Sequence, residues 1–261
     1  MSLLLKDKCA LITGTSSGIG SGIARVFARE GAHLVLTYRK NSSGMDRLMQ
    51  ELGAMGGKVK ALQADISDVT SLPALMKAAV AELGRLDILV NNAGTTERCP
   101  FMDVTPAVYD RIFNTNARGT FFCAQEAARI MARQKSGKII NISTFQTKNV
   151  TANSSVYIAT KGGIDKMTEA MALELAPFNI QVNTVSPGWI TVESDPVMTP
   201  EAAASYLKHI PYGRFGNSDD VGETVAFVAS DRATFMTGAK IVVDGGQSVS
   251  LSFPPRSNEI A

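Results

Sequence analysis

The stretch that decides the fold is Cys9-Ala10-Leu11-Ile12-Thr13-Gly14-Thr15-Ser16-Ser17-Gly18-Ile19-Gly20. Its first part, residues 9–13, is a short apolar run that predicts a buried strand. From Gly18 to Arg29 apolar residues recur at helical spacing, so a helix is expected to follow at once. Glycines in a turn between a strand and a helix let backbone amides approach a phosphate at the helix N-terminus. The stretch therefore predicts the first unit of a nucleotide-binding α/β fold, with a plain glycine-rich turn as the alternative.

Outward from this unit, short β-branched runs alternate with longer helical patterns. The predicted strands lie at residues 9–13, 33–38, 59–64, 86–90, 138–142, 180–185 and 240–243. The predicted helices lie at residues 18–29, 45–52, 69–83, 107–113, 119–133, 157–176 and 220–230. This order predicts a Rossmann-type, doubly wound α/β fold with a mostly parallel seven-stranded sheet and helices on both faces.

The same pattern predicts one domain over residues 1–261, since no Ser/Gly/Pro-rich linker divides the chain. Residues 187–217 form an irregular stretch after a late strand. In an open α/β sheet such an insertion is a candidate lid over the ligand crevice. Residues 248–261, which contain Pro254-Pro255, are expected to form a C-terminal arm.

Composition excludes several classes of protein. The 261 residues include 26 basic and 24 acidic side chains, a balance that gives no electrostatic footprint for nucleic acid or an anionic membrane. Three distant cysteines, Cys9, Cys99 and Cys123, argue against a disulfide framework and for a reducing compartment. Only two histidines, His33 and His209, are present, so a multi-histidine metal centre is not expected. With no signal peptide or apolar span in the sequence, we expect a cytoplasmic protein.

Several motifs then occur in one order. They are the Gly-x-x-x-Gly-x-Gly turn at Gly14, Gly18 and Gly20, then Asn91-Asn92-Ala93-Gly94, then Tyr157-Ile158-Ala159-Thr160-Lys161, then Pro187-Gly188. In these motifs the chain, from about Lys8 to about Gly246, resembles the short-chain dehydrogenase/reductase family. The resemblance implies an NAD(P)-dependent oxidoreductase acting on CH–OH groups, and it implies a homotetramer.

Tyr157 and Lys161 are four residues apart on a predicted helix, so their side chains share one face. Reduction of a carbonyl builds negative charge on oxygen and needs a proton donor. A neighbouring ammonium is expected to lower the pKa of the phenol, which is about 10 when unperturbed. Taken alone, the pair could also be two surface residues of an amphipathic helix.

Two further residues are assigned from the resemblance. The family places a serine thirteen residues before the tyrosine to bond the substrate oxygen, and that offset falls on Thr144, with Ser143 one step earlier. Adjacent residues at a strand end point to opposite sides, so we favour Thr144 and keep Ser143 as the alternative. Asn116 matches the family's fourth catalytic residue, which bends its helix and helps anchor a water that relays protons towards Lys161; helix capping is the alternative.

The end of the second strand decides the expected cofactor. An acidic residue there would bind the adenosine ribose and repel a 2′-phosphate, but the chain has Arg39 and Lys40 instead. A guanidinium suits phosphate because it donates in a fork, so NADP(H) is preferred and NAD(H) is the alternative. The family's threonine near the nicotinamide falls one place after Thr191, at Val192. The predicted cofactor-binding residues are Gly14, Ser16, Ser17, Gly18, Ile19, Gly20, Tyr38, Arg39, Lys40, Asp65, Ile66, Asn92, Ala93, Gly94, Tyr157, Lys161, Pro187, Gly188, Ile190 and Thr191.

The expected activity is an NADP(H)-preferring interconversion of a carbonyl and a secondary alcohol on a small polar substrate such as a sugar, polyol or hydroxy-ketone. Arg98 or Lys148 could instead receive an acidic substrate. A 3-oxoacyl thioester reductase is the second hypothesis, and a catalytically silent NADP(H)-binding regulator is the third. His209 is taken as a loop residue, and no metal site is expected.

Overall fold

Seven strands form one sheet in the computed structural model, which describes residues 3–193 and 198–249. They are β1 (Cys9–Ile12), β2 (His33–Tyr38), β3 (Val59–Gln63), β4 (Ile88–Asn91), β5 (Gly137–Ile142), β6 (Ile180–Pro187) and β9 (Lys240–Val243). Their order across the sheet is β3-β2-β1-β4-β5-β6-β9, and each of these pairings is parallel. The prediction of a seven-stranded, mostly parallel sheet is confirmed, and the described sheet is parallel throughout.

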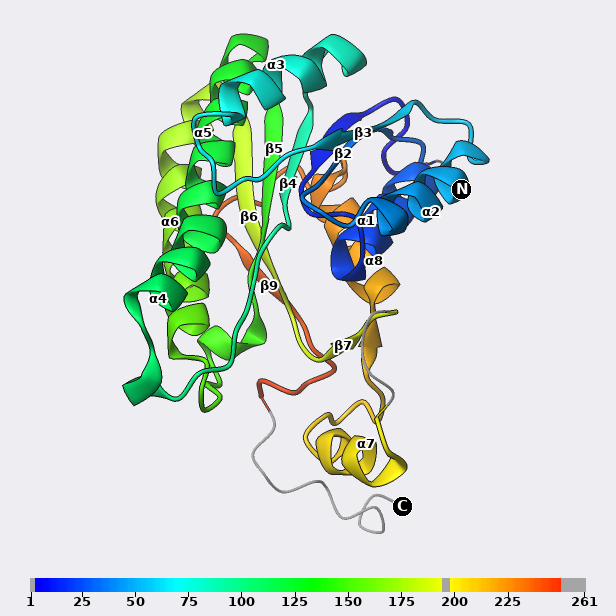
Figure 1. The fold of residues 1–261 in the computed structure, drawn as a ribbon. Coiled ribbons are helices and arrows are strands. Elements are labelled where there is room, and N and C mark those ends of the chain that lie inside the picture. The colour runs from blue at the N-terminus through cyan, green and yellow to red at the C-terminus, as the bar shows by residue number, and fades with distance from the viewer. Residues whose placement is uncertain (1–2, 194–197, 250–261) are drawn as a thin grey trace.

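Helices cover both faces of this sheet (Figure 1). They are α1 (Gly18–Arg29), α2 (Ser42–Gly53), α3 (Leu72–Leu83), α4 (Pro106–Phe113), α5 (Thr120–Gln134), α6 (Ser155–Leu175), α7 (Pro200–Leu207) and α8 (Ser218–Ala229). Figure 1 shows α1, α2 and α8 on one side of the sheet and α3, α5 and α6 on the other. This is the doubly wound arrangement that the alternation of elements predicts.

The period of two along each strand creates a separate core on each face. In β1, Ile12 packs with α1 and α8 residues such as Phe27 and Val225, whereas its neighbour Leu11 packs on the opposite face with Met76 and residues of α5. Both faces of the central strands are therefore apolar, as expected for a parallel sheet covered by helices.

Some boundaries differ from the predicted ones. The helix predicted at 45–52 begins earlier, at Ser42, because Asn41 accepts a hydrogen bond from the Gly44 amide and caps it. The helix predicted at 69–83 begins at Leu72, just before Pro73, which suits a first helical turn. The helices predicted at 107–113 and 119–133 are α4 and α5, and a π-helical turn, Asn114–Gly119, joins them.

The stretch 187–217 has regular structure of its own. It contains α7 and a second, two-stranded parallel sheet formed by β7 (Ile190–Thr191) and β8 (Gly216–Asn217). Residues 194–197 of this stretch, and residues 250–261 of the expected C-terminal arm, lie outside the described part of the chain. None of the described helices is both long enough and apolar enough to cross a membrane.

The strand order places the site. After β1 the chain moves outward through β2 and β3, and after β4 it moves the other way through β5 and β6. Ligands of open α/β sheets bind beyond the carboxyl ends of the strands where the order reverses, here between β1 and β4. The segments that leave β1 and β4 are those that contain Gly14 and Asn92-Ala93-Gly94.

Candidate active site

The turn after β1 is shaped around positions where a side chain does not fit. Gly14 has φ +69°, and a Cβ added to it would lie 2.7 Å from the Ala93 Cα. A Cβ on Gly20 would lie 2.3 Å from the Gly14 carbonyl oxygen, and Gly18 has φ +67°. Glycine alone allows these conformations and approaches without strain. The three glycines bring the backbone of α1 close to the crevice between β1 and β4.

The N-terminus of α1 has the features of an anion site. Ser17 is extended at the N-cap position, but its side chain makes no capping hydrogen bond, and no acidic residue lies in the first helical turn. The first amides of a helix lack partners within the helix and attract negative charge. With the glycines, this arrangement fits the pyrophosphate of a dinucleotide. Ser16 lies in the same turn, and its carbonyl accepts a hydrogen bond from Asn41 Nδ2 at 3.5 Å.

The side chain of Asn92 holds the glycine turn in place. Its Nδ2 donates to the carbonyl oxygens of Thr13 (3.0 Å) and Gly14 (2.8 Å). Thr13 Oγ1 in turn accepts from the amides of Asn92 (3.1 Å) and Ala93 (3.0 Å). Asn92 was predicted to bind the cofactor, and in the structure its side-chain amide joins the end of β4 to the end of β1. Thr13 was missed by sequence reasoning, and its position at the end of the first strand was the available signal.

The ends of β2 and β3 carry the charged groups expected near the adenosine. Arg39 and Lys40 are exposed, and the Arg39 guanidinium lies 4.0 Å from an Asp65 carboxylate oxygen. About half of each of those two side chains is exposed, so this ion pair contributes little to stability. Tyr38 is half-buried beside them, and Ile66 is buried under Gly119. The edge of the crevice therefore presents two cations with one nearby acid.

Tyr157 and Lys161 share one face of α6, as expected from their spacing. Lys161 is buried, and its Nζ donates to the Ile142 carbonyl oxygen at 2.7 Å. Nζ lies 5.9 Å from the centroid of the Tyr157 ring. Burial lowers the pKa of Lys161 to about 8, and the charge of Asp165 opposes this. The Lys161 ammonium behind the tyrosine therefore loses its proton more readily than an exposed lysine does.

The pKa of Tyr157 corrects an expectation from the sequence. Burial raises the pKa of this phenol above its ordinary value, and a hydrogen bond with Thr144 opposes the rise. A lowering by Lys161 was expected, but that ammonium lies 5.9 Å from the ring and bonds to a backbone carbonyl instead. In the protein alone, removal of the phenol from water outweighs the distant charge.

Thr144 and Ser143 point to different surroundings at the end of β5. Ser143 Oγ is buried and donates to the Lys161 carbonyl oxygen at 3.4 Å, so it faces α6. Thr144 has an extended backbone, lines the same pocket as Tyr157 and forms the hydrogen bond that affects that phenol. The structure therefore brings Thr144, and not Ser143, to Tyr157.

Asn116 lies inside the π-helical turn and is fully buried. Its Oδ1 accepts from the Thr95 amide at 2.7 Å, and its Nδ2 donates to the Thr95 carbonyl at 2.8 Å and to Thr160 Oγ1 at 3.2 Å. The side chain caps no helix end, so the capping alternative does not hold. Asn116 instead connects the segment after β4 to α6, one residue before Lys161.

A carboxylate on α6 supports the Thr144 turn from behind. Thr147 Oγ1 donates to Asp165 Oδ2 at 2.8 Å and lies 3.2 Å from the Thr144 carbonyl oxygen. Lys240 Nζ, on β9, donates to the same Asp165 oxygen at 2.7 Å and also to Thr147. Asp165 is four residues after Lys161 and is almost buried. Sequence reasoning missed this group, although its helical spacing from Lys161 was visible.

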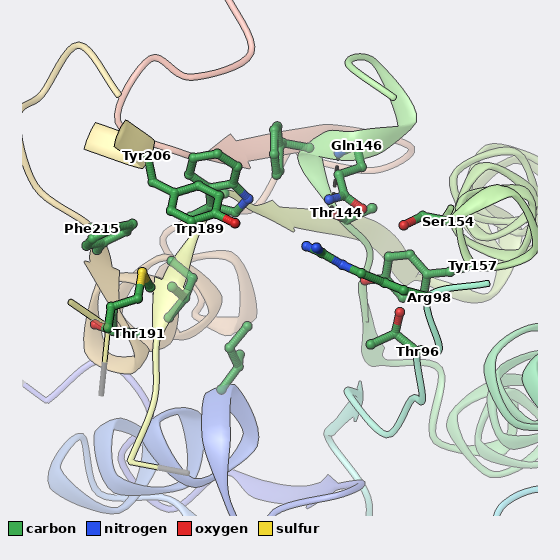
Figure 2. A pocket seen from close by; sticks show the side chains of 15 residues that line it. Thr96, Arg98, Thr144, Gln146, Ser154, Tyr157, Trp189, Thr191, Tyr206 and Phe215 are labelled. Carbon is green, nitrogen blue, oxygen red and sulfur yellow. Dashed lines mark hydrogen bonds between the residues drawn. The ribbon is translucent and has the colours of Figure 1, made fainter. Parts of the chain in front are cut away.

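Tyr157 and Thr144 open into a cavity of about 520 Å³ (Figure 2). The lining residues are Ile19, Thr96, Arg98, Thr144, Phe145, Gln146, Ser154, Tyr157, Gly188, Trp189, Ile190, Thr191, Met198, Tyr206 and Phe215. Five of these, Ile19, Tyr157, Gly188, Ile190 and Thr191, are among the residues predicted to bind the cofactor. Pro187 ends β6 just before Gly188, whose added Cβ would lie 2.6 Å from Asp244.

Aromatic side chains build the wall opposite Tyr157 in Figure 2. Trp189 packs edge-to-face against Tyr206 of α7 at 4.5 Å and against Phe145 at 6.3 Å. His209 packs on Trp189 at 6.4 Å and does not line this cavity, in agreement with a loop role. Ser154 and Phe215 line the cavity and were missed because nothing in their local sequence marks them.

Within residues 3–193 and 198–249, no group of three or more His, Cys, Asp or Glu side chains is placed to hold a metal ion. In the cavity, Tyr157 is the titratable hydroxyl beside Thr144.

Comparison with known proteins agrees with this geometry. The family model described as enoyl-(acyl carrier protein) reductase, in the short-chain dehydrogenase group, matches residues 14–248. An uncharacterised oxidoreductase of Methylorubrum extorquens is 40% identical, over 93% of this chain and 98% of its own. The 3-oxoacyl-[acyl-carrier-protein] reductase FabG of Staphylococcus aureus is 38% identical, over 92% and 97%. The L-rhamnose 1-dehydrogenase (NAD(P)(+)) of Azotobacter vinelandii is 36% identical, over 95% and 100%.

Solved structures give the same result. A short-chain alcohol dehydrogenase from Sinorhizobium meliloti superposes with a TM-score of 0.90 at 38% identity, covering 96% of this chain and 100% of its own. A short-chain dehydrogenase from Burkholderia cenocepacia in complex with NADP gives 0.87 at 30% identity, covering 95% and 100%. A 7α-hydroxysteroid dehydrogenase complexed with NADH and 7-oxo glycochenodeoxycholic acid gives 0.89 at 34% identity, covering 94% and 96%.

The glycine turn, the residues around Tyr157 and these matches lead to one assignment. The chain belongs to the short-chain dehydrogenase/reductase family and is an NAD(P)-dependent oxidoreductase acting on CH–OH groups.

Proposed function

We propose that this chain is an NADP(H)-preferring enzyme that interconverts a carbonyl and a secondary alcohol on a small polar substrate. The observation that carries the proposal is that Tyr157 and Thr144 face one cavity while Lys161 lies buried behind them. That cavity also borders the residues predicted to hold the nicotinamide, such as Ile190 and Thr191. A substrate oxygen could therefore meet both hydroxyls beside the cofactor's reactive ring.

In the proposed mechanism, Thr144 donates a hydrogen bond that orients the substrate carbonyl, and Tyr157 gives its proton to the carbonyl oxygen. Burial keeps the pKa of Tyr157 raised, so the phenol is protonated at neutral pH, as a general acid must be. Lys161 holds positive charge behind the tyrosine and, in this proposal, bonds the cofactor's ribose. Asn116 fixes the segment after β4 through Thr95. When bound, the nicotinamide supplies or accepts the hydride.

The preference for NADP(H) is supported by the end of β2. Arg39 and Lys40 are exposed there, and no acidic residue takes the place that binds the ribose hydroxyls in NAD-dependent enzymes. The NADP and NADH complexes among the structural relatives leave the choice open for the family. Isothermal titration with both cofactors tests it. Arg39→Ser should weaken NADPH binding by about tenfold and leave NADH binding nearly unchanged, and Lys77→Met on α3 is the control.

A second candidate function is reduction of 3-oxoacyl thioesters. It is favoured by the description of the matching family model and by the Staphylococcus aureus relative. Oxidation of NADPH with a 3-oxoacyl thioester carried on acyl carrier protein, run beside a panel of sugars, polyols and hydroxy-ketones, separates the two. Turnover of the thioester alone would replace the leading proposal. Tight NADPH binding with no turnover of any carbonyl would favour the silent regulator.

We also propose that the protein is a cytoplasmic homotetramer. Large apolar side chains are exposed on the outer helices, among them Phe121 of α5 and Leu173 of α6, and on α8 and β9, where Phe227 and Val242 lie. Exposed apolar surface that is contiguous is typical of protein interfaces, and the proposal places these side chains against neighbouring subunits. Sedimentation velocity at several concentrations should give a single species of four chains, and a monomer would contradict the proposal.

A further inference from the structure

The substrate cavity holds one formal charge among its described lining residues, and it is the guanidinium of Arg98. Arg98 follows β4 by seven residues, on the segment that begins with Asn92-Ala93-Gly94. Figure 2 shows its side chain extending into the cavity, with the guanidinium between Thr144 and Trp189. This cation lines the same cavity as the hydroxyls that would act on a substrate.

The acids nearest in sequence to the cavity walls are engaged elsewhere. Glu97, the residue before Arg98, forms an ion pair with Arg111 of α4. Glu193, at the start of the lid stretch, forms an ion pair with Arg25 of α1 at 3.1 Å. Within the described part of the chain, Arg98 makes no hydrogen bond or ion pair. A guanidinium has five N–H donors, and here they are left for a ligand.

The wall opposite Tyr157 suits an apolar or aromatic body. Trp189, Tyr206 and Phe145 form the edge-to-face cluster on one side, and Phe215 and Ile19 extend it. Such walls bind a ring or a short carbon chain through apolar contact. One cation set against aromatic walls favours a ligand with a single negative charge at one end.

We propose that Arg98 binds the carboxylate of the substrate, so that the enzyme reduces oxo acids to hydroxy acids and oxidises the latter. This rests on the proposed function, because it assumes that Tyr157 and Thr144 act on the carbonyl. In the reduction the carbonyl carbon gains a hydride from NADPH, its oxygen gains a proton from Tyr157, and the carboxylate keeps its charge. A guanidinium binds a planar carboxylate through two parallel hydrogen bonds. A singly charged carboxylate matches the single positive charge of the lining better than a phosphate dianion does.

This proposal sharpens the range of small polar substrates considered above. It also distinguishes Arg98 from Lys148, the other cation that could meet an acidic substrate. Lys148 is exposed just after the 3₁₀ turn Phe145–Thr147 and does not line the cavity. The two residues therefore form a matched pair for a test.

The first test measures binding without turnover. Benzoate and benzamide have nearly the same shape and differ in charge, and their dissociation constants from the NADPH complex can be measured by titration. The wild-type protein should prefer benzoate by about tenfold or more, the size expected for a charged hydrogen bond. Arg98→Met should remove the preference, Arg98→Lys should keep part of it, and Lys148→Met should leave it unchanged.

The second test uses turnover of paired substrates, 4-oxopentanoate and its methyl ester, and acetoacetate and its ethyl ester. Arg98→Met should raise KM for the acids by about tenfold and leave KM for the esters nearly unchanged. Equal binding of benzoate and benzamide to the wild-type protein would overturn the proposal. So would a loss of NADPH affinity in Arg98→Met, which would place the guanidinium on the cofactor's phosphates.

The outcomes separate this proposal from the proposed function. A benzoate preference that depends on Arg98, with no turnover of any carbonyl, would support the anion site and refute the oxidoreductase role proposed for Tyr157. Turnover of esters and sugars with no preference for acids would support the oxidoreductase role proposed for Tyr157 and refute the anion site at Arg98. An effect of Arg98→Met confined to thioesters on acyl carrier protein would overturn the proposal in favour of a carrier-protein contact.

Discussion

The half of the molecule around β1 and α1 and the segment around α7, which we propose is a lid, meet at one cavity but are held together differently. α1 has 12 residues, of which eight are buried, whereas α7 has eight residues and none is buried. The glycine turn is fixed by backbone approaches and by hydrogen bonds from Asn92 and Thr13. The lid is held by edge-to-face contacts between Tyr206 and Trp189 and by the short β7–β8 pairing.

This difference shows how one fold serves many substrates. Contacts made by backbone atoms and glycines leave little freedom for sequence change, since an added side chain has no space. Contacts made by the tips of aromatic side chains on an exposed helix can be exchanged at low cost. Mutations in the half around β1 and α1 should therefore lower stability and cofactor affinity. Mutations in the lid should instead change the substrate preference.

The largest effect is expected at the point where the two halves meet. Tyr157→Phe removes the proton donor and should lower kcat by about 100- to 10,000-fold, the usual contribution of a general acid. NADPH affinity should stay within about twofold of wild type, which is small against the tenfold that corresponds to 1.4 kcal/mol. Tyr206→Phe removes another hydroxyl from the same cavity and serves as the control. Stopped-flow reduction of a good carbonyl substrate compares the two variants. Near-normal turnover by Tyr157→Phe would refute the role assigned to Tyr157.

The next largest effect is expected in the glycine turn after β1, where a substitution should lower stability and cofactor affinity. Gly14→Ala places a Cβ against Ala93 at a residue with φ +69°, so it should lower the free energy of unfolding by about 1–3 kcal/mol. It should also weaken NADPH binding, because the turn must move. Gly53→Ala, where a Cβ meets nothing within 4 Å, should change neither quantity appreciably. Thermal melting with and without NADPH measures both variants, and equal behaviour would show that the turn tolerates the side chain.

A third effect concerns the pH range of carbonyl reduction. Reduction needs the phenol of Tyr157 and the ammonium of Lys161, and the pKa of Lys161 is lowered to about 8 by burial, so kcat/KM should fall as pH rises through this range. Asp165→Asn removes the charge that opposes this lowering of the Lys161 pKa. The fall in kcat/KM should then begin at a pH lower by about one unit.

Two variants separate the charge of Asp165 from its hydrogen bonds. Thr147→Val breaks the bond to Asp165 and keeps the carboxylate, so it should lower kcat through Thr144 without moving the pH at which the fall begins. Lys240→Met removes the ammonium that pairs with Asp165 and keeps the carboxylate, so the fall in kcat/KM should not move to lower pH. A shift of equal size in Thr147→Val would show that Asp165 acts on Lys161 through structure and not through charge.

The smallest change in stability is expected in the lid. Tyr206→Leu should lower the free energy of unfolding by about 1 kcal/mol or less, the value of one edge-to-face pair. KM for the carbonyl should change while NADPH affinity does not. Tyr109→Leu removes a similar ring from a stacked pair with Phe113 at 4.3 Å, away from the cavity, and should leave KM unchanged. Steady-state kinetics of the two variants compare them directly, and an equal rise in KM would argue against a substrate wall at Tyr206.

The fold could be predicted nearly in full because its signals are local. Apolar strands, amphipathic helices and the glycine turn all follow from the order of residues, and Asp165 and Lys161 share a helix face by spacing alone. The alternation of side chains along a strand also separates Thr144 from Ser143. The orientation of these groups follows from geometry that any strand or helix has.

What could not be predicted depends on contacts between distant segments. Trp189 meets Phe145 and Tyr206, which come from distant segments of the chain, and Lys240 reaches Asp165 from the last strand. The direction of the Tyr157 pKa was wrong because burial, a property of the whole fold, outweighs the neighbouring ammonium. The π-helical turn at Asn114–Gly119 was also not predicted, because the helical patterns at residues 107–113 and 119–133 leave the residues between them unassigned.

The pairing of β7 with β8 has a consequence for engineering. Ile190 lies beside Gly216 and Thr191 beside Asn217, so the chain leaves and returns at neighbouring points. Residues 192–215 therefore form a cassette whose exchange for the equivalent segment of a relative would leave the spacing of its ends unchanged. Because closing a loop between fixed ends costs little more as the loop lengthens, grafted segments of different length should be accepted, and the chimaeras would take on new substrates with the old coenzyme.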